Sequence, residues 1–347
     1  MRELVEHLAS GHKLDAQNLN TLLRGCVADG DVLQLLRDNA VRTAQKQFGL
    51  GVYVRGLVEV SSYCRANCLY CGLRCSNRSA ERYRLTADEI LECCKEGYAL
   101  GFRTFVLQGG EDGTHSDAWL EEVICRIRSN FADAAITLSL GERSEESYLR
   151  LRRAGADRYL LRHESADSKL YASLHPSSRG LEHRLECVRA LQRCGYQVGM
   201  GMMIGVKGQS IDHIVKDILL MSEYNCQMVG IGPFLPHSAT PLGGEPAGDI
   251  RLTLAAVAIM RLLLPKALIP STTALATILP EGRNAGILSG ANVVMPNLSP
   301  SGVRRKYAIY ENKASWGSEA AEGLAALERE LNAIGYHIDF ARGDYKQ

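Results

Sequence analysis

A regular alternation of apolar strand-like segments with helix-like segments is the feature that most restricts the fold of this 347-residue chain. Runs rich in β-branched and apolar residues predict strands at 52–54, 57–60, 104–107, 135–140, 158–161, 197–204, 228–231, 268–270 and 292–295. Helical spacing predicts helices at 87–99, 117–129, 145–153, 181–194, 211–223, 252–264 and 282–288. Continuous apolar strands between helices indicate a parallel sheet that is covered on both faces. An open doubly wound sheet and a closed barrel both fit, but about eight strands favour an α/β fold of the (β/α)8 TIM-barrel type.

The chain divides into a helical N-terminal part and the alternating part. Residues 1–47 carry leucines at helical spacing, and Gly30 and Asp31 can end one helix and cap the next. We therefore predict an N-terminal helical extension over 1–47. The barrel occupies 48–347 and ends with a helix at 315–334.

Charge and composition exclude several classes of protein. Lys and Arg number 40 and Asp and Glu 39, so the net charge of +1 gives no electrostatic reason to bind nucleic acid or an anionic membrane. The N-terminus has charges throughout and lacks the apolar stretch of a secretory signal, which predicts a cytoplasmic protein. Eleven cysteines, an odd number, in such a chain argue against a disulfide scaffold.

Four of these cysteines lie close together, directly after the first predicted strand. Cys64, Cys68 and Cys71 form a Cys-x3-Cys-x2-Cys array, and Cys75 follows. A structural zinc site would need four ligands, and the sequence offers no second pair of cysteines with zinc-knuckle spacing. A [4Fe–4S] cluster normally takes four cysteines, so three would leave one iron open to another ligand.

The array, with an aromatic residue (Tyr70) before its third cysteine, resembles the signature of radical S-adenosylmethionine (SAM) enzymes. The resemblance implies that Cys64, Cys68 and Cys71 bind one [4Fe–4S] cluster and that SAM chelates its open iron. Reductive cleavage of SAM would yield a 5′-deoxyadenosyl radical. Cys75 is expected to be a bystander. Many members of the family that this chain resembles carry an auxiliary iron–sulfur site near the C-terminus; because no cysteine lies beyond Cys226, we expect a single cluster here.

Three further segments suit a SAM site, although each also has an ordinary structural interpretation. Gly109 and Gly110, before Glu111, let the backbone approach a small ligand closely, but they also suit a simple turn. Glu164 can accept hydrogen bonds from ribose hydroxyls, but it could equally form a surface ion pair. Arg184 lies in a charged helix and would by itself be interpreted as solvated.

Taken together, these motifs resemble the HydE family, the radical SAM maturases of [FeFe]-hydrogenase, over about residues 45–310. The segments that carry the likeness are 64–74, 82–86, 106–112, 137–142, 155–164, 228–237, 270–274 and 291–297. Biotin synthase and methylornithine synthase are expected relatives. For the cofactor, the resemblance implies that Glu164 binds the SAM ribose, Arg184 binds the SAM carboxylate and Met203 lines the SAM pocket. For the substrate, it implies an inner barrel site lined by Arg158, Thr137, Gln108, Thr272, Thr273, Tyr307 and Tyr310.

Polar residues on barrel strands support such a cavity, because barrel interiors are normally filled by branched apolar side chains. Arg158 would present a fork to a substrate carboxylate. As single residues, the threonines could also be strand hydroxyls with local partners.

The resemblance implies a function in assembling the hydrogenase H-cluster. The substrate would be a cysteine-bound Fe(II) that carries CO and cyanide, delivered by a HydG-type maturase. The product would pass towards a HydF-type scaffold, and neither nucleic acid nor membrane is an expected partner. A methylornithine synthase-type mutase and a non-catalytic metal-binding protein are the alternatives.

Overall fold

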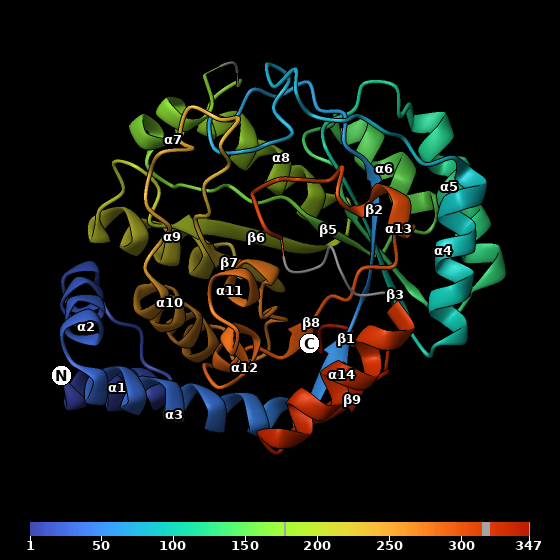
Figure 1. The fold of residues 1–347 in the computed structure, drawn as a ribbon. Helices are drawn as coiled ribbons and strands as arrows, with labels where there is room; N and C mark the ends of the chain where they lie inside the picture. Colours follow the sequence, from blue (N-terminus) through green and yellow to red (C-terminus); the bar gives the residue numbers. More distant parts are fainter. Residues whose placement is uncertain (177, 314–319, 347) are drawn as a thin grey trace.

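Parallel strands form the centre of the molecule, and the computed structural model describes residues 1–176, 178–313 and 320–346 (Figure 1). Six strands pair in the order β2-β3-β4-β5-β6-β7, and every pair is parallel. Their bounds are β2 (Gly56–Ser61), β3 (Thr104–Gly109), β4 (Ala135–Ser139), β5 (Arg158–Leu160), β6 (Gln197–Ile204) and β7 (Met228–Pro233). Sequential order with parallel pairing is the pattern expected of a (β/α)8 barrel.

Single β-bridges close this sheet into a ring. Met228 of β7 pairs with Leu268, and Pro270 pairs with Val293 of the short strand β8 (Val293–Val294). Leu57 of β2 then pairs with Asn297. The last two strand positions of the barrel are therefore irregular. Residues 268–270, which we predicted as a strand, contribute only single bridges. A (β/α)8-type barrel nevertheless results, as the sequence predicted.

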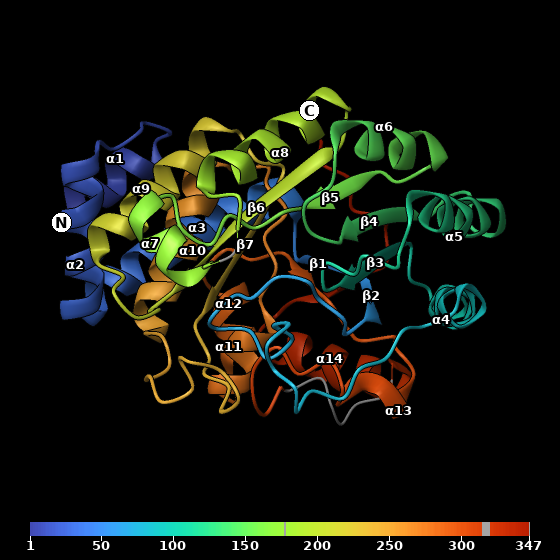
Figure 2. The same cartoon turned by 90° about the horizontal axis from the view of Figure 1, so that it is seen from above.

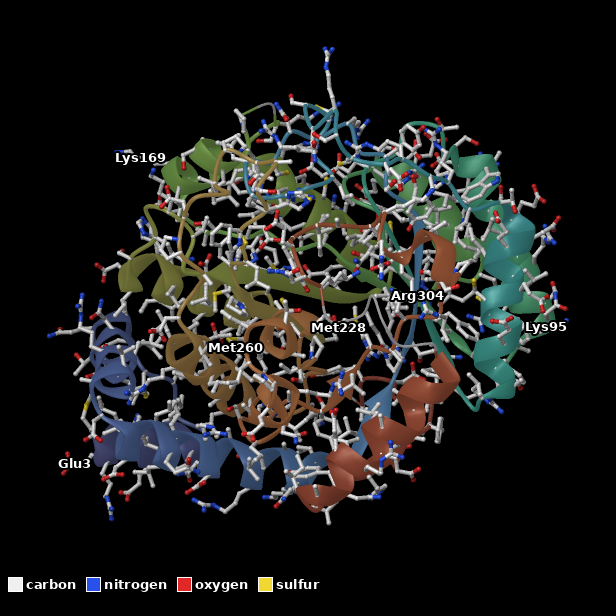
Figure 3. All side chains as sticks on the ribbon, viewed as in Figure 1. Glu3, Lys95, Lys169, Met228, Met260 and Arg304 are labelled. Atoms are coloured by element: carbon white, nitrogen blue, oxygen red, sulfur yellow. The ribbon has the colours of Figure 1, made fainter. Side chains whose placement is uncertain are left out.

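Helices cover the outside of the barrel between successive strands. Their bounds are α4 (Ala87–Ala99), α5 (Asp117–Asn130), α6 (Glu145–Ala154), α8 (Leu181–Arg193), α9 (Ile211–Glu223), α10 (Ile250–Leu263) and α12 (Gly282–Ile287). Short helices that we did not predict are α7 (Ser168–Leu174), α11 (Thr273–Ile278) and α13 (Ser301–Arg304). Charged groups such as Lys95 lie at the periphery, whereas Met228 and Met260 lie in the interior (Figure 3).

The N-terminal residues form three helices: α1 (Arg2–Ala9), α2 (Ala16–Ala28) and α3 (Gly30–Phe48). Asp29 caps α3 by accepting a hydrogen bond from the Asp31 N–H at 2.8 Å. These helices contact α9 and α10, on the side of the barrel away from α4 and α5 (Figure 2). They share one continuous apolar core with the barrel. Their treatment as a separate unit stays a prediction.

The C-terminal residues pack along the barrel and under it. The described part of the predicted last helix is α14 (Ala320–Ala333), and residues 315–319 lie outside the described residues. Strand β9 (His337–Asp339) then pairs in parallel with β1 (Gly51–Val54), which precedes β2. The tail from Arg342 to Tyr345 contacts the amino-terminal ends of the barrel strands. Within the described ranges, no helix combines the length and the apolar character needed to cross a membrane.

Candidate active site

The segment between β2 and α4, residues 62–86, carries the three predicted iron ligands and lies across the top of the molecule in Figure 1. We call it the cluster loop. Arg82 organises it, because its guanidinium donates to the backbone carbonyls of Ser62, Leu73, Arg74 and Asn77. One side chain thereby joins the start of the loop to its middle, which holds an irregular segment in a fixed shape.

Cys64, Cys68 and Cys71 lie on this loop as partly buried thiols. Burial raises the pKa of each, to about 12 for Cys68, and the neighbouring cysteines raise the pKa values of Cys68 and Cys71 further. The Glu111 N–H donates to Cys64 Sγ at 3.3 Å, which favours the thiolate. Such thiols stay protonated until a cation binds. A metal group would displace their protons and stabilise the thiolates.

No three His, Cys, Asp or Glu side chains among the described residues converge closely enough to hold a single metal ion. A [4Fe–4S] cluster is bound through separate irons, so its cysteines need not meet at one atom. Three partly buried thiols on one loop fit such a group.

Gly110 gives the cluster loop its close contact with β3. A Cβ at this position would lie 2.2 Å from the Tyr63 carbonyl oxygen and 2.6 Å from Cys64 Cβ. The Gly110 carbonyl accepts a hydrogen bond from the Asp112 N–H at 2.8 Å and keeps a second lone pair for a ligand. The backbone of the cluster loop therefore passes too close to residue 110 for any side chain, which explains the glycine at this position.

A cavity of about 260 Å³ opens beside Cys68. Its lining residues are Arg65, Ala66, Asn67, Cys68, Glu111, Glu142, His175, Ser178, Arg179 and Arg184. Arg184 is largely buried there, and its Nε lies 3.1 Å from Glu142 Oε1 and 3.4 Å from the Tyr171 hydroxyl. Its Nη1 lies 3.8 Å from Glu111 Oε1. The structure thus brings a predicted cluster ligand, Cys68, together with two predicted SAM residues, Arg184 and Glu111.

Glu164 and Met203 lie on the Cys71 side of the cluster loop. Glu164 has a positive φ of 63° and accepts a hydrogen bond from Arg162 Nη2 at 2.9 Å. Burial raises the pKa values of Tyr70 and Cys71, and the negative charge of Glu164 adds to this rise. Met203 packs in an apolar cluster with Leu69 and Tyr70.

The barrel interior contains polar atoms that have no partner in the described part of the chain. They are Thr137 Oγ1, Thr272 Oγ1, Arg162 Nε, and Arg55 Nε and Nη2. Gln108 donates to the Tyr307 hydroxyl at 3.4 Å, and Tyr310 lies within electrostatic range of Arg162. Unpaired buried polar atoms are costly, so this interior suits a polar ligand. Thr273 begins α11 next to Thr272, at the same end of the barrel.

Arg158 does not have the environment that we expected. Its Nη2 lies 2.7 Å from Asp344 Oδ1 and also donates to the carbonyls of Arg342 and Gly343 at 3.0 and 3.1 Å. The chain itself therefore supplies the anion that we assigned to a substrate carboxylate. The structure does not support the predicted substrate role of Arg158, because this residue anchors the C-terminal tail at the base of the barrel.

Arg162 is an interior arginine for which we predicted no role from the sequence. A Cβ at Gly201 would lie 3.0 Å from Arg162 Cγ and 2.1 Å from the Gly230 carbonyl oxygen, so glycines make room for this side chain. Its Nη2 bonds Glu164 and the Met202 carbonyl, while its Nε has no partner within the described ranges. Its position beside Glu164 in the sequence was the available signal.

A buried ion pair between Glu59 and Lys313 was also missed. The Asn297 amide donates to Glu59 Oε2 at 3.0 Å, and Glu59 lies in a strand where a charge is unusual, which was the available signal. The pair ties residues 307–313, which we call the covering segment, to the barrel interior. The same segment is tied to the cluster loop, because the Gly72 N–H donates to the Ile309 carbonyl at 2.9 Å.

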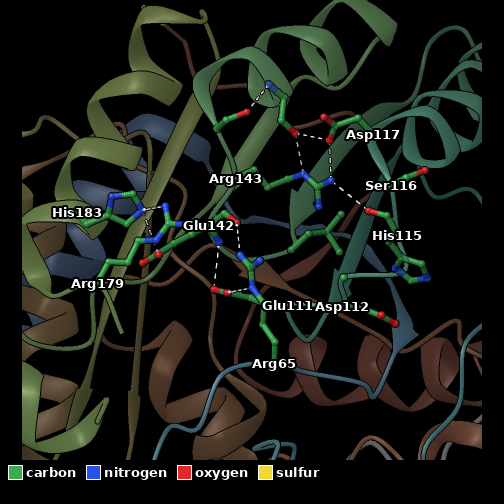
Figure 4. A pocket seen from close by; sticks show the side chains of 14 residues that line it. Arg65, Glu111, Asp112, His115, Ser116, Asp117, Glu142, Arg143, Arg179 and His183 are labelled. Carbon is green, nitrogen blue, oxygen red and sulfur yellow. Dashed lines mark hydrogen bonds and ion pairs between the residues drawn. The ribbon is translucent and has the colours of Figure 1, made fainter. Parts of the chain in front are cut away.

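A wider basin of about 640 Å³ adjoins the cavity and shares Arg65, Glu111, Glu142 and Arg179 with it (Figure 4). Arg65 pairs with Glu111 at 3.3 Å, and His183 lies 3.4 Å from Glu142. These charged groups form the boundary between the inner cavity and the basin.

Comparison with known proteins decides the family. The model of the Radical SAM superfamily matches residues 58–221. The [FeFe] hydrogenase maturase subunit HydE of Thermotoga maritima is 46% identical over 269 residues, covering 78% of this chain and 76% of that protein. This chain belongs to the HydE family of radical SAM enzymes.

Other similar proteins agree with the fold. The 3-methylornithine synthase of Methanosarcina barkeri is 29% identical over 96% of this chain and 92% of its own length. The crystal structure of methylornithine synthase aligns with a TM-score of 0.84 at 27% identity, covering 97% of each chain. The structure of the [FeFe]-hydrogenase maturase HydG aligns with a TM-score of 0.82, covering 97% of this chain and 75% of that one, and at 19% identity it shows the fold alone.

Proposed function

We propose that this HydE-family enzyme acts in the maturation of [FeFe]-hydrogenase, through radical SAM chemistry inside its barrel. The observation that carries the proposal is the set of three thiols on one loop, beside a cavity that contains a buried arginine, in a chain 46% identical to HydE. When bound, the cluster and SAM supply a 5′-deoxyadenosyl radical.

The residues around the two cofactors have distinct tasks in this proposal. Cys64, Cys68 and Cys71 hold the cluster. Arg184 binds the SAM carboxylate with charge-assisted hydrogen bonds, and Glu164 binds the ribose. Gly109, Gly110 and Glu111 line the approach of the SAM amino group, and Met203 packs against its apolar part.

The substrate site of the proposal is the barrel interior. Thr137, Gln108, Thr272 and Thr273 offer hydroxyl and amide groups there, while Tyr307 and Tyr310 close one side. Arg162, with an unpaired Nε, replaces Arg158 as the group for a substrate carboxylate. A cysteine-bound iron carbonyl cyanide, delivered by a HydG-type maturase and passed on to a HydF-type scaffold, is the substrate that family membership favours. These steps would take place in the cytoplasm.

Anaerobic reconstitution with iron and sulfide, followed by EPR with and without SAM, tests the cofactor part. One cluster predicts about four irons per chain, since Cys226 is the last cysteine. Replacing Cys64, Cys68 or Cys71 by Ser should abolish 5′-deoxyadenosine formation. Cys75→Ser is the matched control, because Cys75 is exposed on the same loop. About six irons, or equal loss in the control, would contradict the one-cluster site.

Hydrogenase maturation in a reconstituted system tests the rest of the proposal. Arg162→Lys keeps the charge but removes the fork, so it should retain SAM cleavage and lose maturation. Wild-type maturation by this variant would contradict the substrate placement. The methylornithine synthase alternative is the weaker one on identity, and formation of 3-methylornithine would support it.

A further inference from the structure

Glu164 has a backbone conformation that residues with a side chain rarely adopt. Its φ is 63°, in the left-handed region that glycine normally occupies. The Ser165 N–H donates to the His163 carbonyl at 2.8 Å, which closes a γ-turn with Glu164 at its centre. A γ-turn with positive φ is strained, and it persists only where its surroundings hold it. The neighbours of Glu164 should therefore include the groups that hold this turn.

A buried pair of side chains lies directly beside the turn. His163, from the turn itself, and Asp217, from α9, both have fully buried side chains. His163 Nε2 lies 3.1 Å from Asp217 Oδ1. Because an ionised carboxylate only accepts hydrogen bonds, Nε2 is the ring nitrogen that carries the proton. The imidazole is thus directed at α9, whereas the carboxylate of the next residue, Glu164, bonds Arg162 at 2.9 Å.

Asp217 fastens the chain on both sides of Glu164. The Oδ1 atom that receives the His163 imidazole also accepts a hydrogen bond from the Ala166 N–H. From the other side, the N–H groups of His163 and Glu164 both donate to the Gly201 carbonyl of β6, at 3.1 and 3.0 Å. The turn is therefore clamped between β6 and α9, which pack against each other (Figure 1). The α9 half of this clamp is a single carboxylate oxygen.

Stability of the fold does not by itself account for the buried pair. His163 Nδ1 and Asp217 Oδ2 have no hydrogen-bond partner among the residues that the structure describes. Each unsatisfied buried polar atom costs free energy, and apolar residues of similar size would pack here without that cost. What the pair adds is a fixed backbone on each side of Glu164, and this backbone decides where the Glu164 carboxylate points.

We propose that His163 and Asp217 are positioning residues for Glu164, which hold its carboxylate where it accepts hydrogen bonds from the ribose hydroxyls of SAM. The inference rests on the proposed function, because it is there that Glu164 binds the ribose. Neither His163 nor Asp217 touches SAM. They hold the γ-turn in advance, so the carboxylate does not have to be ordered when SAM binds. Their loss should weaken the ribose contact and spare the contacts of the SAM amino and carboxylate groups.

The test compares SAM with 2′,3′-dideoxy-SAM, an analogue that lacks both ribose hydroxyls. Equilibrium dialysis against the reconstituted enzyme gives the Kd of each compound, with the cluster kept oxidised so that no SAM is cleaved. The ratio of the Kd of the analogue to the Kd of SAM measures the ribose contact alone. A variant that merely disturbs the fold raises both Kd values and leaves their ratio unchanged.

Two variants remove the clamp, and two serve as controls. Asp217→Leu removes the acceptor of the His163 and Ala166 hydrogen bonds. His163→Asn is too short to reach Asp217, whereas His163→Gln places an amide nitrogen near the position of Nε2 and keeps the donor. Lys216→Met is the matched control on α9. Lys216 pairs with Asp167 at 2.7 Å, just beyond the turn, but its side chain is 54% exposed.

For the wild type we expect a Kd ratio of about tenfold or more, because the analogue loses hydrogen bonds to a charged acceptor. Asp217→Leu and His163→Asn should lower the ratio to about threefold or less at full iron content, since the carboxylate is no longer held in place. The ratio should stay at the wild-type value in His163→Gln and Lys216→Met.

An unchanged ratio in either clamp variant, or an equal fall in either control, would overturn the positioning role. If Asp217→Leu does not fold, the comparison of His163→Asn with His163→Gln decides. A wild-type ratio near one would instead refute the ribose contact of the proposed function, and the inference with it.

Discussion

At the scale of single residues, Arg184, which we propose to bind the SAM carboxylate, is held in place by its neighbours. Glu142 and the Tyr171 hydroxyl hold the Nε edge of the guanidinium, at 3.1 and 3.4 Å. Its Nη1 lies 3.8 Å from Glu111 Oε1, and under the proposal the Nη edge receives the SAM carboxylate. A buried cation that is oriented on one edge offers a pre-organised fork on the other.

Removing either proposed SAM contact should weaken SAM binding and leave the cluster in place. Charge-assisted hydrogen bonds contribute about 1.5–3 kcal/mol, so Arg184→Ala or Glu164→Gln should raise the Kd for SAM by about one to two decades. The measurement is a SAM titration followed by the change in the cluster EPR signal. A variant with normal affinity and full iron content would show that its residue does not bind SAM.

Glu142→Gln tests the orienting role separately. The amide keeps a hydrogen-bond acceptor for Arg184 Nε but loses the charge, so we expect a smaller rise in the Kd for SAM, of about threefold to tenfold. Glu142→Ala should lose more, because no acceptor remains. Equal effects of the two variants would show that the charge of Glu142, rather than its position, is what matters.

The candidate site could be predicted from sequence to the extent that its residues are local. The three cysteines lie within eight residues, and their spacing carries their chemistry. The partner of Arg158, Asp344, is 186 positions away. The residues around Arg158 and around Asp344 contain no pattern that predicts this pairing. Long-range partners are decided by how the tail packs, which the local sequence does not encode.

At the scale of elements, the cluster loop depends on a side chain rather than on regular secondary structure. Arg82 bridges four carbonyls, which a lysine cannot do because it lacks the planar fork. Arg82→Lys should therefore keep the three thiols but lose iron several times faster in the presence of a chelator. Arg78→Lys is the matched control on the same loop. Equal iron retention by both variants would contradict the organising role of Arg82.

Elements with their own end signals were predicted accurately, whereas the shortest elements were missed. The bounds of α4 match the prediction, because Thr86 and Glu89 form a capping box that fixes its start. The helices α7, α11 and α13 are too short to show a period. Residues 268–270 make only single β-bridges. Their apolar side chains predicted a strand, but these residues form no regular ladder with their neighbours.

At the scale of the whole molecule, the ion pair of Arg158 and Asp344 joins the tail to the barrel base. Burial acts to raise the pKa of Asp344, but the hydrogen bond and charge of Arg158 outweigh it and lower this pKa below its usual value. A lowered pKa means that the carboxylate adds stability above its unfolded pKa, and that this contribution disappears as the pH falls through the folded pKa. The tail therefore contributes most at neutral pH.

Asp344→Asn should lower the free energy of unfolding by about 1–3 kcal/mol at pH 7, less than for a fully buried pair because the Asp344 side chain is 41% exposed. The difference from the wild type should shrink as the pH drops below about 3.9. Urea unfolding of the apoprotein between pH 3 and pH 7 measures it. A difference that is constant with pH would exclude the ion pair as its source.

The covering segment has a consequence for how long the barrel retains its contents. It is tied to the interior by Lys313 and Glu59 and to the cluster loop through Gly72 and Ile309. Because opening must separate a buried ion pair as well as this backbone hydrogen bond, the open form is a minor population at any moment. A product that leaves past this segment must wait for these contacts to break, which slows its release. Under the proposed function, a slow exit would give a receiving protein time to bind before the product reaches the solvent.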